Sequence, residues 1–83
     1  MNRAAIYALI DAERDQQAIK WGGPHDWGSG DCSSQDVADI VKVAILAEET
    51  GEVARAVLDG SGLRTELVQV AAICVAWLEA TSG

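Results

Sequence analysis

The last helical segment, about residues 63–80, is the feature that most limits how this sequence can fold. Its first turns carry Arg64, Glu66 and Gln69, and the remainder is apolar on nearly every face up to Trp77. A helix that is hydrophobic all round is buried all round. Two other helices in a chain of 83 residues cannot cover it well. We therefore expect a homo-oligomer, a homodimer or homotetramer in which paired helical hairpins form a four-helix core.

Two further segments have helical patterns. Residues 2–20 carry a modest apolar stripe at 3.6-residue spacing, and residues 34–59 carry a longer one. Ser33 or Ser34 can cap the second of these segments as part of a capping box. Its link to the segment 63–80 is so short that the two helices should be antiparallel neighbours. We predict a single all-α domain, a helical hairpin plus an N-terminal helix.

Charge and hydropathy exclude several classes of partner. A net charge of −7 argues against a nucleic-acid polymer, because such binding relies on basic surfaces. The longest apolar run, residues 67–78, has 12 residues and is too short to span a bilayer. The start has no signal-peptide pattern, and the two cysteines form no CxxC pair. We expect a cytoplasmic protein with reduced thiols and no membrane partner.

Residues 21–33 form a predicted loop with an unusual composition. They hold the only proline, the only histidine (His25) and two of the three tryptophans, Trp21 and Trp27. A loop of this length in so small a domain is usually functional or disordered, and its tryptophans favour a functional role. His25 by itself is more often an ordinary loop residue than a ligand.

An acidic cluster interrupts the apolar stripe of the segment 34–59. Glu48 and Glu49 both project beside Glu52 on a helix, and like charges so placed repel by a few tenths of a kcal/mol per pair. A divalent cation such as Mg²⁺ is a natural counter-charge. Gly51, in the same cluster, costs roughly 1 kcal/mol relative to Ala in a helix. Close approach of a partner helix or a ligand would explain it.

The antiparallel hairpin brings this cluster towards a second polar pair. At about 1.5 Å per residue, Glu52 lies about 12 Å before the turn, and Glu66 and Gln69 lie about 6–10 Å beyond it. Glu49 and Glu52 share one helix face, as do Glu66 and Gln69. We therefore expect four oxygen-bearing side chains to converge on a polar pocket.

These motifs resemble a known family over roughly residues 13–80. EExxE on one helix followed by ExxD on the next is the signature of the MazG-like all-α nucleotide pyrophosphohydrolases. Here residues 48–52 read EETGE and residues 66–69 read ELVQ. Residues 17–22 read QAIKWG and look like the Q-x-x-KWG end of the first helix in many small members.

The resemblance implies cleavage of a nucleoside triphosphate (NTP or dNTP) between the α and β phosphates, giving a nucleoside monophosphate and pyrophosphate. The reaction would depend on Mg²⁺, with Mn²⁺ as a possible substitute. By position, Glu49, Glu52 and Glu66 would ligate the metal together with Gln69. Glu48 would orient or deprotonate the attacking water as a general base.

The resemblance also implies substrate-binding residues. Lys20 and Arg64 would neutralise phosphate oxygens, and Trp21 and Trp27 would lie near the base or sugar, where a flat ring can stack. Gln17 belongs to the same motif and is assigned to the substrate site with them.

One position departs from the family pattern. The second motif usually ends in Asp, and this chain has Gln69. Fewer metal ions, weaker metal affinity, or binding without cleavage would each follow from the lost charge. One alternative function is therefore a catalytically weakened nucleotide- or metal-binding module. Another is a structural oligomerisation domain, in which the acidic cluster is a solvated face balanced by Arg55 and Lys42.

Overall fold

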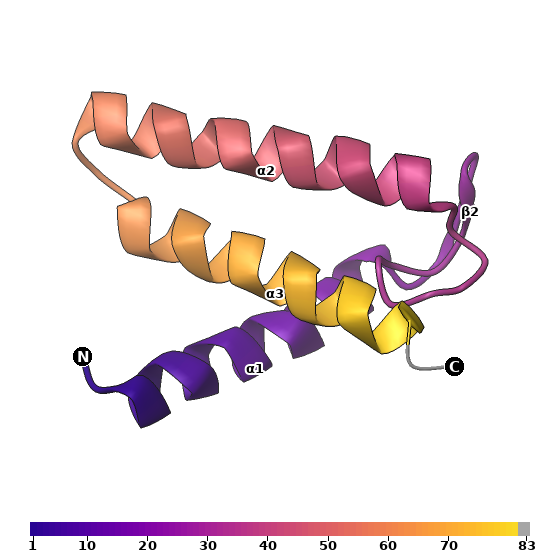
Figure 1. Cartoon of the computed structure of the whole chain (residues 1–83), viewed down its shortest axis with the longest axis horizontal. Helices are drawn as coiled ribbons and strands as arrows, with labels where there is room; N and C mark the ends of the chain where they lie inside the picture. The colour runs from indigo at the N-terminus through magenta and orange to yellow at the C-terminus, as the bar shows by residue number, and fades with distance from the viewer. Residues whose placement is uncertain (82–83) are drawn as a thin grey trace.

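The computed structural model describes residues 1–81, which form three α-helices and one small β-hairpin (Figure 1). In chain order the elements are α1 (Arg3–Trp21), β1 (Pro24–His25), β2 (Gly28–Ser29), α2 (Asp39–Asp59) and α3 (Leu63–Thr81). The prediction of a mostly helical fold is confirmed, and each helix overlaps its predicted segment.

The helix α3 lies between the other two helices and packs against both α1 and α2 (Figure 1). The helices α2 and α3 run antiparallel across a tight turn, as their short link predicted. Gly60 allows this turn, because its φ of 73° lies in the left-handed region that favours glycine. Its N–H donates to the Ala56 carbonyl at 2.9 Å, which closes the last turn of α2.

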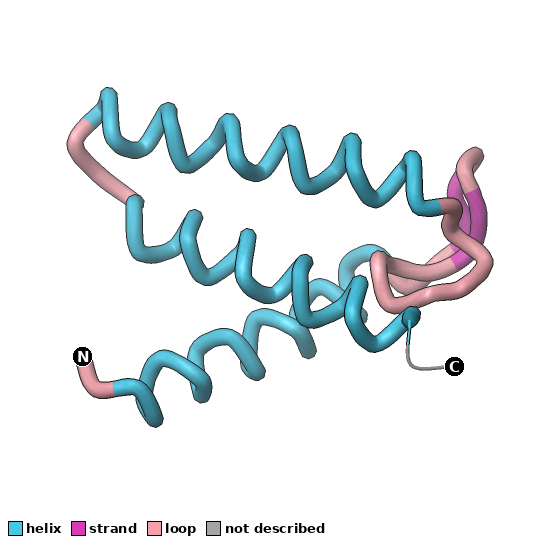
Figure 2. The backbone as a smooth tube through the Cα atoms, in the orientation of Figure 1, coloured by secondary structure: helices cyan, strands magenta, loops and turns pink. Residues whose placement is uncertain are grey.

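The helix α2 begins at Asp39, later than the predicted start at residue 34. The predicted cap by Ser33 or Ser34 is wrong, because Ala38 is the N-cap residue and makes no side-chain cap. The Ser34 hydroxyl instead donates to the Ser29 carbonyl at 2.6 Å and accepts from the Asp36 N–H at 3.1 Å. These bonds belong to the loop, which Figure 2 shows between α1 and α2 with the short β-hairpin inside it.

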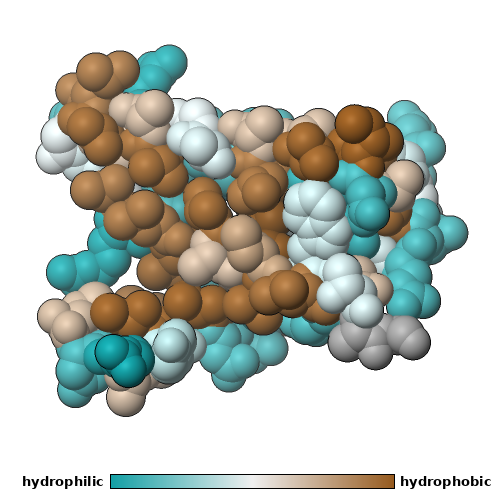
Figure 3. All heavy atoms as spheres, in the orientation of Figure 1, coloured by the Kyte–Doolittle hydropathy of each residue, from teal (hydrophilic) through white to brown (hydrophobic). Residues whose placement is uncertain are grey.

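The buried apolar core is small. The buried hydrophobic residues are Cys32, Val37, Ala56, Ala72, Ile73 and Ala76. Much larger side chains on α2 and α3 remain exposed, for example Leu58 at 84%, Leu67 at 50% and Leu78 at 66%. Figure 3 shows hydrophobic residues across much of the face over these helices. The single chain thus leaves a large apolar surface uncovered.

None of the helices within residues 1–81 is both long enough and apolar enough to cross a membrane.

Candidate functional site

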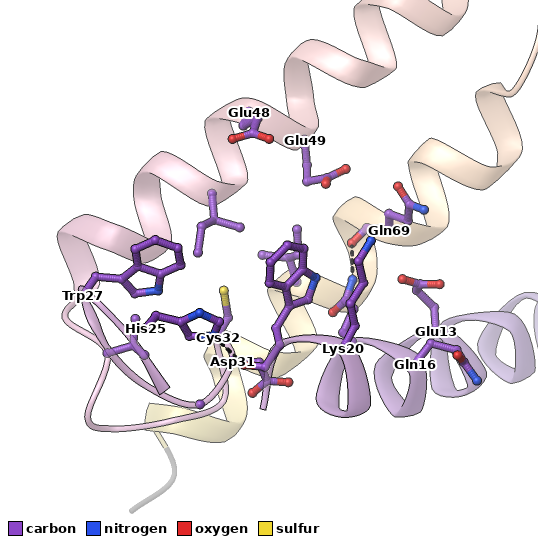
Figure 4. Close-up of a pocket in the computed structure, with 16 residues that line it drawn as sticks. Glu13, Gln16, Lys20, His25, Trp27, Asp31, Cys32, Glu48, Glu49 and Gln69 are labelled. Atoms are coloured by element: carbon purple, nitrogen blue, oxygen red, sulfur yellow. Dashed lines mark hydrogen bonds between the residues drawn. The ribbon is translucent and has the colours of Figure 1, made fainter. Parts of the chain in front are cut away.

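A cavity of about 470 Å³ lies between the three helices and the loop (Figure 4). One end is polar and carries three carboxylates and three amides, and we call it the acidic end. This end is lined by Glu13, Gln16, Gln17, Glu48, Glu49 and Gln69. The other end is mainly aromatic and apolar, with Gly30 and Asp31 of the loop beside it, and we call it the aromatic end. It is lined by Trp21, His25, Trp27, Cys32, Val37, Ile45 and Ile73. Lys20 also lines the cavity.

Seven of the ten residues predicted for the site line this cavity. They are Gln17, Lys20, Trp21, Trp27, Glu48, Glu49 and Gln69. Glu52 and Glu66 do not line it, but both lie close enough to Glu49 to act on its charge. Arg64 lies on a separate groove of about 480 Å³ with apolar residues of α1 and α3. The structure therefore brings the two acidic motifs together and leaves Arg64 apart from the cavity.

Gln69 connects the carboxylates of the two motifs. With its amide oriented to satisfy hydrogen bonding, the nitrogen donates to Glu66 Oε2 at 2.9 Å and to Glu49 Oε2 at 3.3 Å. The backbone of the same residue is also held, because Gln17 Nε2 donates to the Gln69 carbonyl at 3.4 Å. Residues of α1, α2 and α3 thus meet at Gln69, α2 through its side chain and α1 through its backbone carbonyl.

Glu49 is a partly buried carboxylate with several acidic neighbours. Burial raises its pKa, and the negative charges of four other carboxylates raise it further: Glu66, Glu48, Glu52 and Glu13. Burial and the neighbouring charges each disfavour the ionised form of Glu49. A cation beside its carboxylate would favour that form. The acidic end therefore gathers carboxylates whose negative charges repel one another.

The oxygen atoms at the acidic end are of the type that binds a hard cation, but they are not arranged to hold one together. Carboxylate oxygens and an amide oxygen are ligands that Mg²⁺ accepts. Within residues 1–81, however, no three His, Cys, Asp or Glu side chains are placed to hold a metal ion together. The Gln69 amide nitrogen faces the carboxylates, so the amide would have to turn before its oxygen could join them as a ligand.

The aromatic end is an ordered stack. The rings of His25 and Trp27 are nearly parallel, with an interplanar angle of 5° and centroids 4.7 Å apart. His25 Nε2 lies 2.8 Å from the Trp21 carbonyl oxygen. A carbonyl oxygen only accepts, so Nε2 carries the proton. The Lys20 ammonium lies 5.1 Å from the centroid of the Trp21 ring, within the range of a cation–π contact.

Several lining residues were not predicted from the sequence. Glu13, Gln16, Gln17 and Lys20 share one face of α1 at helical spacing, so a polar stripe along that face could have identified Glu13 and Gln16. His25, Asp31 and Cys32 come from the loop. Their positions depend on contacts that have no periodic pattern in the sequence.

Comparison of the chain with known proteins found no matching family model and no match among curated proteins or solved structures.

Proposed function

We propose that the protein is a Mg²⁺-dependent nucleotide pyrophosphohydrolase of the MazG-like kind, which cleaves an NTP or dNTP to the monophosphate and pyrophosphate. The observation that carries the proposal is the division of one cavity into an acidic end and an aromatic end. A nucleoside triphosphate has a matching division, with a flat base at one end and a charged phosphate chain at the other.

The charges of the cavity support a requirement for a divalent cation. Glu13, Asp31, Glu48 and Glu49 line it, against Lys20 as a cation. A triphosphate would be repelled by these carboxylates unless positive ions accompanied it. Bound Mg²⁺ would neutralise phosphate oxygens and stabilise the charge that develops on them. Glu49, Glu52 and Glu66 are the side chains proposed to hold it, together with Gln69 once its amide has turned.

The remaining roles follow from position in the cavity. Glu48 lies at the acidic end of the cavity and is exposed, so it can accept a proton from a water molecule that attacks the phosphate. Lys20 projects from α1 between the two ends and can contact phosphate oxygens. Trp21 and Trp27 present ring surface to a base.

The test is release of pyrophosphate from a panel of NTPs and dNTPs with and without Mg²⁺. We expect turnover of at least one nucleotide, and a loss of at least about 100-fold for Glu49→Gln or Glu52→Gln. Asp15→Asn, at an exposed position of α1, is the matched control. Absence of turnover for every nucleotide, or full activity of both glutamine variants, would contradict the proposal.

We also propose that the chain works as a homo-oligomer whose subunits bury their α2 and α3 apolar surfaces against each other. Ile40, Val57, Leu58 and Leu78 are each more than 60% exposed in the single chain. Contiguous apolar surface of this kind is characteristic of a protein interface. A second copy can cover it, because each copy presents the same surface.

A weakened nucleotide-binding module is the second candidate, and the Gln69 contacts favour it. An amide nitrogen directed at Glu49 and Glu66 neutralises part of the repulsion without a metal ion. In this case a nucleotide would raise the melting temperature and remain intact. Gln69→Asp would then create turnover that wild type lacks. If the protein is an active enzyme, wild type cleaves the nucleotide without this substitution.

A further inference from the structure

Among residues 1–81, two charged side chains are buried, Arg14 at 9% exposure and Lys42 at 2%. They come from different helices, α1 and α2. Both contact the same stretch of loop, residues 31–34, which follows the β-hairpin. Burying a charge is costly unless it makes compensating contacts. We therefore asked what the protein gains by burying both charged side chains against one loop.

Arg14 fastens the loop to α1 and α3. Its Nη1 donates to Asp31 Oδ2 at 3.0 Å, and its Nε donates to Glu79 Oε1 at 3.0 Å. The other oxygen of Asp31 accepts from the N–H and the hydroxyl of Ser33, at 2.9 and 2.5 Å. Burial alone would raise the pKa of Asp31, but the bonds from Ser33 and Arg14 outweigh it and lower the pKa.

Lys42 fastens the same loop to α2. Its Nζ donates to the Ser34 carbonyl at 2.9 Å. The Ser34 hydroxyl in turn donates to the Ser29 carbonyl at 2.6 Å, and the Ser29 N–H donates to Asp36 Oδ2 at 2.7 Å. Ser29 is in strand β2, so these bonds connect Lys42 to the hairpin.

The two attachments determine where the aromatic end of the cavity lies. The loop leaves α1 at Trp21 and returns to it at Arg14, seven residues earlier, which is about 10 Å back along the helix. His25 and Trp27 lie in the hairpin between these two points. Moving residues 31–34 would therefore move both rings relative to Glu48 and Glu49 on α2.

Stability alone does not explain Lys42. Burying an ammonium group costs free energy, and a hydrogen bond to one carbonyl offsets only part of that cost. The described contacts of the Lys42 ammonium consist of a single backbone acceptor, and no described carboxylate pairs with it. A methionine could fill the same space without the buried charge, at the cost of the bond to the loop.

We propose that Arg14 and Lys42 are positioning residues. They hold His25 and Trp27 of the β-hairpin at the distance from the acidic end of the cavity that a nucleotide needs. This inference rests on the proposed function. It assigns neither side chain a contact with the substrate, and neither lines the cavity. It predicts that the two residues affect ligands that carry a base and leave ligands without one unaffected.

The experiment compares Lys42→Met with wild type and with Arg3→Met, which removes an exposed cation from α1. We expect Lys42→Met to melt at the wild-type temperature or higher, with KM for the preferred nucleotide raised about tenfold and kcat little changed. Inorganic tripolyphosphate carries no base, so its inhibition constant should stay unchanged. Arg14→Lys should raise KM similarly, because an ammonium cannot donate in the same forked geometry to Asp31 and Glu79.

The outcomes separate this inference from the proposed function. If Lys42→Met weakens the nucleotide and tripolyphosphate equally, or weakens neither, the inference is wrong. If wild type cleaves no nucleotide, the proposed function fails, and hydrogen exchange still tests the positioning. Amides of residues 22–37 should then exchange faster in Lys42→Met at an unchanged melting temperature. Unchanged exchange there would overturn the inference in either case.

Discussion

Gln69 is the residue on which the acidic end of the cavity depends. Its amide nitrogen contacts Glu49 and Glu66, so it compensates two carboxylates in the absence of a cation. An aspartate at this position, as in the MazG-like pattern, would instead add a third negative charge. The glutamine therefore stabilises the two carboxylates without a cation, and it carries one negative charge fewer than an aspartate would.

The stability of Gln69→Asp should depend on Mg²⁺ more strongly than that of wild type. In metal-free buffer the variant should lose about 1–2 kcal/mol of unfolding free energy, because it removes a donor and adds repulsion. With Mg²⁺ it should recover more stability than wild type does. Thermal denaturation with EDTA and with Mg²⁺ measures both effects. Gln69→Leu is the control, since it loses the donor without adding a ligand, and equal Mg²⁺ responses of all three proteins would refute the argument.

Asp31 predicts a pH dependence. Its pKa lies below the ordinary value of 3.8, so its contribution to stability is present above that value and is lost as the pH falls through the folded-state pKa. Asp31→Asn should therefore lower the unfolding free energy by about 1–3 kcal/mol at neutral pH. The difference from wild type should shrink below about pH 4. Urea denaturation over a series of pH values from neutral into the acid range tests this, and a difference that does not shrink as the pH falls would contradict it.

Most of the predicted residues that line the cavity lie on helices, and Trp27 is the one predicted residue from the loop among them. Glu48, Glu49 and Gln69 were placed together from helical spacing and one short turn. The Arg14 contacts join residues 17 and 65 positions apart, and no local pattern records such separations. The roles assigned to Glu48, Glu49 and Gln69 remain predictions, whereas their proximity to the cavity is a feature of the fold.

At the scale of elements, α2 contains an unexplained glycine. We expected a close neighbour beside Gly51, but a Cβ at that position would meet no atom within 4 Å in the single chain. Gly51→Ala should then stabilise the protein by about 0.5–1 kcal/mol through helix propensity alone. Chemical denaturation checks this value. A loss of stability would indicate that a ligand or another subunit packs closely against this point of α2.

The sequence predicted the start of α3 correctly and the start of α2 incorrectly. The start of α3 was predicted at residue 63 because glycines precede it in a short turn, and Gly60 and Gly62 do adopt positive φ there. The start of α2 was misplaced because Ser34 has the chemistry of an N-cap. Its hydroxyl bonds equally well within the loop, and the choice between these partners depends on the tertiary position of the hairpin.

At the scale of the whole molecule, the helical composition predicted the fold class better than it predicted the core. The three helices form as expected, yet the buried side chains of α3 are Ala72, Ile73 and Ala76. The apolar pattern of a helix shows that its faces must be covered and does not show which chain covers them. The exposed apolar side chains of α2 and α3 are therefore the basis of the proposed oligomer.

Leu67 allows a direct test of that proposal. It is 50% exposed in the single chain, so Leu67→Gln should cost an isolated subunit little. In an oligomer the same change would bury an amide without a partner, at a cost of about 1–3 kcal/mol for each copy. Sedimentation or light scattering should find wild type at a multiple of the 8.7 kDa subunit mass, and Leu67→Gln shifted towards the single subunit. Ile19→Gln, at a 78% exposed position of α1, is the matched control. Wild type at the mass of one subunit would refute the oligomer, because the exposed apolar surface would then have no partner of its own kind.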